Sequence, residues 1–166
     1  MPEPKLVRGD GALARAFLAG APSESETAMI EAGTIASAGY IVCAVEDAGV
    51  PVGLAGLRLS SRAPALFVAV RDDLQGRGLG RALTEDVMRA SFRKYGYLTL
   101  STYERPEYAA AIAMYRRLGF RHLARRGDKI WMIASDGVKG RIAGLLVRVV
   151  YPLILSRRDR RRVGQA

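Results

Sequence analysis

The order of apolar and polar residues divides the chain into segments typical of strands and segments typical of helices. Short apolar runs bounded by turn residues predict strands over Lys5–Arg8, Tyr40–Glu46, Val52–Ser60, Leu66–Val70, Tyr97–Thr102, Phe120–Arg125 and Lys129–Ala134. Capping residues and apolar positions three or four apart predict helices over Ala12–Leu18, Ser23–Glu31, Leu79–Tyr95 and Pro106–Leu118. With sequential antiparallel strands early in the chain, this order predicts a mixed α/β (α+β) fold.

A glycine-rich loop separates the Leu66–Val70 strand from the helix that begins near Leu79. It reads Gln75-Gly76-Arg77-Gly78-Leu79-Gly80, and Arg81 follows. Glycines remove the side chains that would hold a ligand away from the backbone, and the N–H groups at the start of a helix attract anions. The loop therefore predicts a phosphate or pyrophosphate site. Its spacing fits neither a Walker loop nor the dinucleotide fingerprint, and a tight connection that binds nothing is the alternative.

Two motifs resemble the GNAT acyltransferase superfamily. Gln75-x-x-Gly78-x-Gly80 resembles that family's acyl-CoA pyrophosphate loop, and Ala110–Phe120 resembles its A-x-x-x-Y-x-x-x-G-F segment. The resemblance covers about residues 5–135. It implies the GNAT fold, which is a mixed, mostly antiparallel central sheet flanked by helices. It also implies an N-acetyltransferase that moves an acyl group, most often acetyl, from acyl-CoA to a primary amine by direct attack.

The resemblance further implies which residues contact the co-substrate, acetyl-CoA. Backbone groups of Val68 and Val70 would pair with the pantetheine arm, and the Val70 N–H would polarise the thioester carbonyl. Tyr108 stands where the family usually has an asparagine that contacts pantetheine. The expected binding residues are Val68, Val70, Gln75, Gly76, Arg77, Gly78, Leu79, Gly80, Arg81 and Tyr108.

Tyr115 is the expected catalytic side chain, since the family's tyrosine at this position is proposed to protonate the departing thiolate. The alternative is a core tyrosine whose hydroxyl lies at the rim. A general base must also keep the amine neutral. Glu104 follows a predicted strand and is the first candidate, with Glu46 and Glu107 behind it, although each could equally be a surface carboxylate without a role.

The composition limits the other classes of function. The chain has 166 residues with a single cysteine, Cys43, and a single histidine, His122. A disulfide framework is therefore excluded, and we expect no metal site. The start of the sequence lacks the apolar stretch of a signal peptide, so we expect a cytoplasmic protein, with a peripheral position at the inner face of the membrane as the alternative.

The last thirty residues differ from the rest, so we divide the chain into a domain over residues 1–136 and a tail over residues 137–166. Of the net charge of +10, the tail carries +7, from eight Lys and Arg against one Asp. Its apolar run, Val138–Leu155, is interrupted by Arg141, Arg148 and Pro152. Such a helix with a polybasic end predicts an anionic membrane surface as partner of residues 138–162. Packing on the domain, or in a homodimer, is the alternative.

The acceptor is the least determined part of the interpretation. A small-molecule or glycan amine is expected, and the tail suggests one linked to the membrane. Nucleic acid is disfavoured, because aromatic residues do not alternate with the arginines of the tail. A non-catalytic acyl-CoA sensor or scaffold, and an enzyme that takes its acyl group from an acyl carrier protein, are the competing interpretations.

Overall fold

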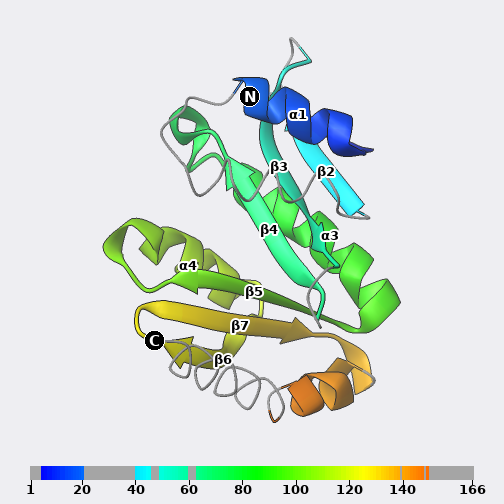
Figure 1. The fold of residues 1–166 in the computed structure, drawn as a ribbon, viewed down its shortest axis with the longest axis vertical. Coiled ribbons are helices and arrows are strands. Elements are labelled where there is room, and N and C mark those ends of the chain that lie inside the picture. Colours follow the sequence, from blue (N-terminus) through cyan, green and yellow to red (C-terminus); the bar gives the residue numbers. More distant parts are fainter. Residues whose placement is uncertain are drawn as a thin grey trace, which may run out of the picture. The chain divides into compact units, whose positions relative to one another are not determined.

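The computed structural model describes residues 5–20, 40–45, 49–59, 63–138, 140–147 and 149, without the side chains of Cys43 and Val45. The chain divides into two compact units, Met1–Arg93 and Lys94–Ala166. We refer to them as the N-terminal unit and the C-terminal unit. Each has antiparallel strands and helices of its own (Figure 1).

The N-terminal unit contains four strands that pair antiparallel in chain order. They are β1 (Lys5–Gly9), β2 (Tyr40–Val45), β3 (Pro51–Arg58) and β4 (Ala65–Val70). Every residue of β3 from Pro51 to Leu57 is buried, so this strand is covered on both faces.

Two helices cover the faces of this sheet (Figure 1). Helix α1 (Gly11–Gly20) packs on one face through a cluster of buried apolar side chains, namely Ala14, Phe17, Ile41, Leu54 and Phe67. The other face receives α3 (Leu79–Tyr95), whose Leu83 lies against Gly53 of β3. A short 3-10 turn, η1 (Asp72–Leu74), follows β4 and leads into the loop before α3.

The C-terminal unit contains three strands in the spatial order β5-β7-β6, all antiparallel. They are β5 (Tyr97–Tyr103), β6 (Arg121–Arg126) and β7 (Lys129–Ser135). A 3-10 turn, η2 (Pro106–Tyr108), and helix α4 (Ala109–Arg117) connect β5 to β6. After β7, residues 137–138, 140–147 and 149 are helical.

The predicted fold class is confirmed, because all seven expected strands are present and helices flank them. The expected helix over Leu79–Tyr95 has the predicted limits, and Gly96 ends it with a φ of +76°. Asp10 caps α1 as expected, since its Oδ1 accepts the Ala12 N–H at 2.8 Å. The helix expected over Ser23–Glu31, and the tail beyond residue 149, lie outside the described residues.

Two details differ from the sequence prediction. Pro106 opens the 3-10 turn η2, and the α-helix begins only at Ala109, which fits a proline's preference for first turns. In α3 the predicted apolar periodicity does not extend to the end of the helix, because the buried face runs through Leu79, Leu83 and Val87 to Ser91 while Phe92 is only half-buried.

Candidate functional site

The end of β4 directs backbone groups of Val68 and Val70 away from β3. The Arg71 N–H donates to the Val52 carbonyl at 3.0 Å, and Val70 stands opposite Gly53. In an antiparallel pair, residues alternate between those that bond the neighbouring strand and those that do not. Val70 and Val68 therefore direct their N–H and C=O groups to the edge away from β3, which is the orientation that the expected pantetheine contacts require.

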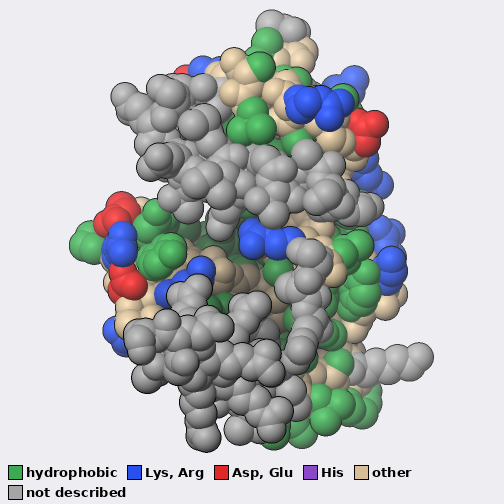
Figure 2. All heavy atoms as spheres, viewed as in Figure 1, with side chains coloured by type: hydrophobic (Ala, Val, Ile, Leu, Met, Phe, Trp, Pro, Cys, Tyr) green, Lys and Arg blue, Asp and Glu red, His purple; other side chains and the backbone are tan. Residues whose placement is uncertain are grey.

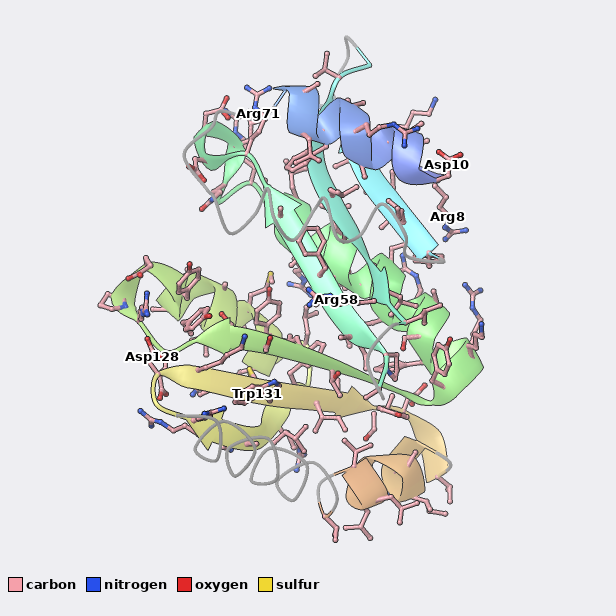
Figure 3. The ribbon with its side chains drawn as sticks, in the orientation of Figure 1. Arg8, Asp10, Arg58, Arg71, Asp128 and Trp131 are labelled. Atoms are coloured by element: carbon pink, nitrogen blue, oxygen red, sulfur yellow. The ribbon has the colours of Figure 1, made fainter. Side chains whose placement is uncertain are left out.

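The side chain of Gln75 ties the glycine loop to the end of β4. Its Nε2 donates to Asp72 Oδ1 at 2.8 Å and to the Val70 carbonyl at 3.4 Å. Beside it, Arg71 (labelled in Figure 3) pairs with Asp73 at 2.7 Å, and this hydrogen bond lowers the pKa of the Asp73 carboxyl. The loop is thus held by polar contacts at its base, while Gln75 itself and residues 76–78 remain exposed.

Gly76 and Gly78 provide an open backbone surface. Their φ angles are +76° and +82°, a conformation that side chains disfavour. A Cβ built at either position would meet nothing within 4 Å. Glycine is therefore favoured at both positions by the backbone conformation and not by close contact with neighbouring atoms. The space beside the two residues is accessible to a ligand.

The start of α3 completes the anion site. Ala82 N–H donates to the Gly78 carbonyl at 3.0 Å, so the N–H groups of residues 79–81 come before the first N–H that donates within the helix. The first turn contains no acidic residue. Unpaired N–H groups and the positive end of the helix dipole favour bound phosphate, so these residues fit the pyrophosphate of acyl-CoA.

Two arginines add positive charge around the loop. Arg77 is exposed, and its charge contributes to the lowered pKa of Asp73. The Arg81 side chain is 65% exposed and pairs with Glu85 at 2.9 Å. Because Glu85 compensates part of the charge of Arg81, Arg77 is the stronger candidate for steering an anion to the loop.

Tyr115 lies in the C-terminal unit, buried in α4 with 8% of its surface exposed. Its ring meets the edge of Phe120 at a centroid distance of 5.8 Å. The Phe120 N–H donates to the Tyr115 carbonyl at 3.0 Å. The chain can turn back to form this bond because Gly119 adopts a φ of +90°. The spacing Tyr-x-x-x-Gly-Phe therefore has a structural reason of its own.

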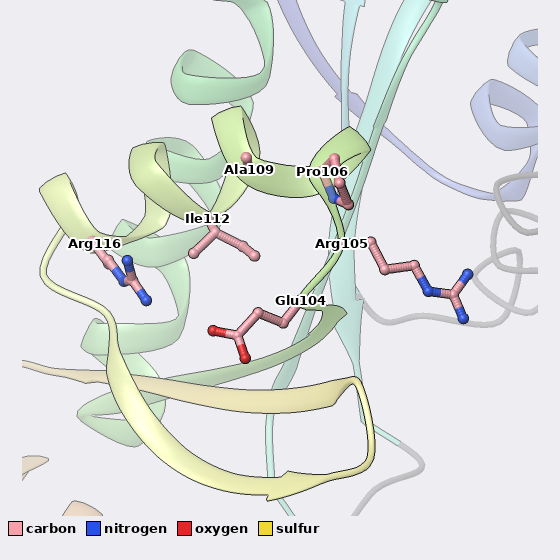
Figure 4. Close-up of a pocket in the computed structure, with 6 residues that line it drawn as sticks. All are labelled: Glu104, Arg105, Pro106, Ala109, Ile112 and Arg116. Carbon is pink, nitrogen blue, oxygen red and sulfur yellow. The ribbon is translucent and has the colours of Figure 1, made fainter.

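Glu104 lines a pocket of about 270 Å³ in the C-terminal unit, together with Arg105, Pro106, Ala109, Ile112 and Arg116 (Figure 4). Its carboxylate pairs with Arg125 Nη1 at 2.9 Å. Tyr115 does not line this pocket. The two expected catalytic side chains, Glu104 and Tyr115, therefore do not both line this pocket.

Tyr108 belongs to a cluster of aromatic and basic residues that the sequence analysis missed. Its ring centroid is 6.2 Å from that of Tyr103. Arg105 and Lys129 lie over the Tyr103 ring at 4.9 and 5.3 Å, and Lys129 also lies 5.7 Å from the Trp131 ring. Tyr103 is the direct neighbour of Lys129 across β5 and β7. Alternation along these two strands could have identified the cluster.

A second missed feature is the buried carboxylate of Asp86 in α3, whose side chain is 5% exposed. It accepts hydrogen bonds from Arg8 of β1, Tyr40 of β2 and Arg89 of α3. Burial raises the pKa of Asp86, but these three donors outweigh it and lower the pKa to about 2. Asp86 therefore ties α3 to the first two strands. The sequence signal for this feature is the position of the Asp86 carboxylate on the apolar side of the predicted helix.

Comparison with known protein families gives a match for this chain. Residues 37–122 match the family model described as acetyltransferase (GNAT) domain. That range contains the end of β4, the glycine loop, all of α3 and Tyr115. A search of curated proteins found no match.

Solved structures share the fold. The ribosomal-protein-S18-alanine N-acetyltransferase of Escherichia coli superposes with a TM-score of 0.63 at 23% identity, over 82% of this chain and 97% of that one. The Salmonella typhimurium protein yncA, solved with its cofactor acetyl-CoA, gives a TM-score of 0.62 at 17% identity, over 82% and 95%. A phosphinothricin acetyltransferase of Sinorhizobium meliloti in complex with acetyl-CoA gives 0.59 at 17% identity, over 82% and 90%.

Proposed function

The chain belongs to the GNAT acetyltransferase family, and on that premise we propose that it transfers an acetyl group from acetyl-CoA to a primary amine. The observation that carries the proposal is the glycine loop at the start of α3. Two glycines with open space beside them, a first turn without carboxylates and two nearby arginines suit a pyrophosphate. Acetyl-CoA contains that group, and two of the structural relatives were solved with it.

We assign the residues that hold the donor as follows. Residues 76–81 receive the pyrophosphate through their N–H groups, and Gln75 keeps the loop in place from its base. Val68 and Val70 receive the pantetheine arm through the backbone groups that they direct away from β3. Tyr108 takes the place of the family's asparagine, so we expect an aromatic contact with pantetheine where the family has an amide contact.

The proposed chemistry is direct transfer. The amine nitrogen forms a bond to the thioester carbon, and the carbon–sulfur bond breaks. The Val70 N–H stabilises the negative charge that develops on the carbonyl oxygen. The Tyr115 hydroxyl donates its proton to the departing sulfur, and a carboxylate takes a proton from the amine. Glu104 is our candidate for that base, and Arg125 holds its carboxylate at the pocket of the C-terminal unit.

The test measures thiol release from acetyl-CoA with a panel of small-molecule and glycan amines. Tyr115→Phe keeps the ring that packs on Phe120 and removes only the hydroxyl. We expect kcat to fall about 100-fold, in the range that general acids contribute. The matched control is Tyr95→Phe at the end of α3, for which we expect the wild-type rate.

Two outcomes would contradict the proposal at different points. Unchanged turnover in Tyr115→Phe would remove the acid role and leave the transferase intact. Calorimetric binding of CoA without turnover of any amine would favour an acyl-CoA sensor. A cytoplasmic location remains a prediction.

A further inference from the structure

The helical segment after β7 exposes large aliphatic side chains. Seven large hydrophobic residues are exposed among those that the structure describes, and five of them belong to this segment. They are Val138, Ile142, Leu145, Leu146 and Val149, each between 58% and 71% exposed. The spacing of four, three, one and three residues places them on one side of a helix, which we call the aliphatic face. Figure 2 shows hydrophobic side chains gathered where Figure 1 draws this helix.

The opposite side of the same helix is built from glycines. Gly140 and Gly144 are both buried. A Cβ at Gly140 would collide with the carbonyl oxygen of Gly96, and one at Gly144 would lie 3.7 Å from Ile133 Cδ1. The glycines therefore let the helix approach the end of β7 and the turn at Gly96 closely, and the larger side chains are directed outward.

This arrangement is the reverse of an ordinary surface helix, which buries its large apolar residues and exposes polar ones. Water around five aliphatic side chains is unfavourable, and a contiguous exposed apolar patch is typical of an interaction site. Since the glycine side packs on the protein, the aliphatic face is the side of the described helix that a partner could cover.

Charge identifies the kind of partner. Arg141 is exposed in the helix, the sequence of the same stretch contains Lys139 and Arg148, and residues 137–166 carry a net charge of +7. A second copy of the chain would bring two such stretches together, and their like charges would repel. An anionic lipid surface attracts both features, because aliphatic side chains enter the acyl boundary while Lys and Arg meet the headgroups.

We propose that the aliphatic face docks on an anionic membrane surface, with the helix lying in the plane of that surface. The proposal rests on residues 138–149 and does not depend on acetyl transfer. Among the described residues, no helix is long and apolar enough to cross a membrane.

The experiment is co-sedimentation of the full chain with vesicles of phosphatidylcholine alone or of phosphatidylcholine with phosphatidylglycerol. We expect binding to the anionic vesicles, and weaker binding at high salt. The double variant Leu145→Ser/Leu146→Ser should lower the affinity at least about tenfold, since each buried CH₂ group contributes to membrane binding. Both side chains are more than 60% exposed, so we expect the wild-type thermal midpoint.

The matched control is Val50→Ser/Leu59→Ser, which changes the two large exposed hydrophobic residues among those that the structure describes in the N-terminal unit. We expect it to bind anionic vesicles like the wild type. Equal binding of the Leu145/Leu146 variant and the wild type would overturn the proposal, as would failure of the wild type to bind anionic vesicles. A dimer in light scattering that the Leu145/Leu146 variant abolishes, together with absent vesicle binding, would assign the face to a second copy.

Discussion

The glycine loop before α3 and the glycine side of the last helix use the same residue for opposite purposes. Gly76 and Gly78 have positive φ angles and open space around them, so they keep backbone N–H groups accessible. Gly140 and Gly144 pack against neighbouring atoms, so they bring two segments close together. The first pair is typical of a binding site and the second of a packing interface. A glycine in a sequence therefore indicates function only once its surroundings are known.

The largest expected effect comes from Gly140→Ala. Its Cβ would collide with the backbone carbonyl of Gly96, which cannot rotate away as a side chain can. We expect the free energy of unfolding to fall by about 3 kcal/mol, measured by thermal unfolding. Gly144→Ala is the matched control, because its nearest neighbour lies at an ordinary 3.7 Å. Alanine there should leave stability unchanged or raise it by up to about 1 kcal/mol; equal losses in both variants would contradict the packing role.

Acid should destabilise the region of the glycine loop more than the last helix. The reason is that α3, which begins at the loop, is anchored by the titratable carboxylate of Asp86. The folded-state pKa of Asp86 is about 2, below its ordinary value of 3.8. The stability that this carboxylate contributes is therefore present above pH 3.8 and is lost as the pH falls toward 2, by about 2 kcal/mol. Hydrogen exchange of α3 measures this loss.

Asp86→Asn is the control for the pH dependence of stability. We expect it to lose about 2 kcal/mol at neutral pH, because an amide cannot pair with Arg8 and Arg89. It should then show no further loss from this group between pH 4 and pH 2. Identical acid profiles in the variant and the wild type would mean that other carboxylates dominate.

Gly78→Ala tests the open loop. Alanine at a φ of +82° should cost about 1.5 kcal/mol and weaken CoA binding about tenfold as the loop relaxes to another conformation. Gly49→Ala carries similar strain, at a φ of +73° with no atom within 4 Å, but lies outside the loop. Calorimetry should therefore show lower stability in both variants and weaker CoA binding only in Gly78→Ala. Weaker binding in both would point to a global effect.

The smallest expected effect concerns the two arginines of the loop. Arg77→Ala should weaken CoA binding about threefold at low salt, in line with one charge near a helix N-terminus. Arg81→Ala should have a smaller effect, since Glu85 already pairs with it. Titration at low and high salt checks both, and the difference should shrink as salt increases. The reverse order would mean that Arg81 leaves Glu85 when CoA binds.

The sequence predicted the features that depend on neighbouring residues. Short apolar runs bounded by turn residues located the strands, Asp10 indicated the cap of α1, and glycine marked the end of α3 at Gly96. The position of the glycine loop between a strand and a helix was also predicted correctly.

Features that join distant residues could not be predicted in this way. Asp86 lies 78 residues from Arg8 and 46 residues from Tyr40 along the chain, and the pairing of β1 with β2 and the packing of α3 bring the three together. The pairing of Glu104 with Arg125 likewise depends on how β6 lies beside β7. The site residues expected from the family resemblance remain predictions until activity or binding is measured.

The turn at Gly119 has a consequence for how this chain could change in evolution. The carbonyl and the ring of Tyr115 are used by Phe120, while the proposed proton transfer uses the hydroxyl. Phenylalanine at position 115 would keep the carbonyl and the ring that Phe120 contacts. Gly119 and Phe120 could therefore persist in a descendant that had lost the proposed proton transfer.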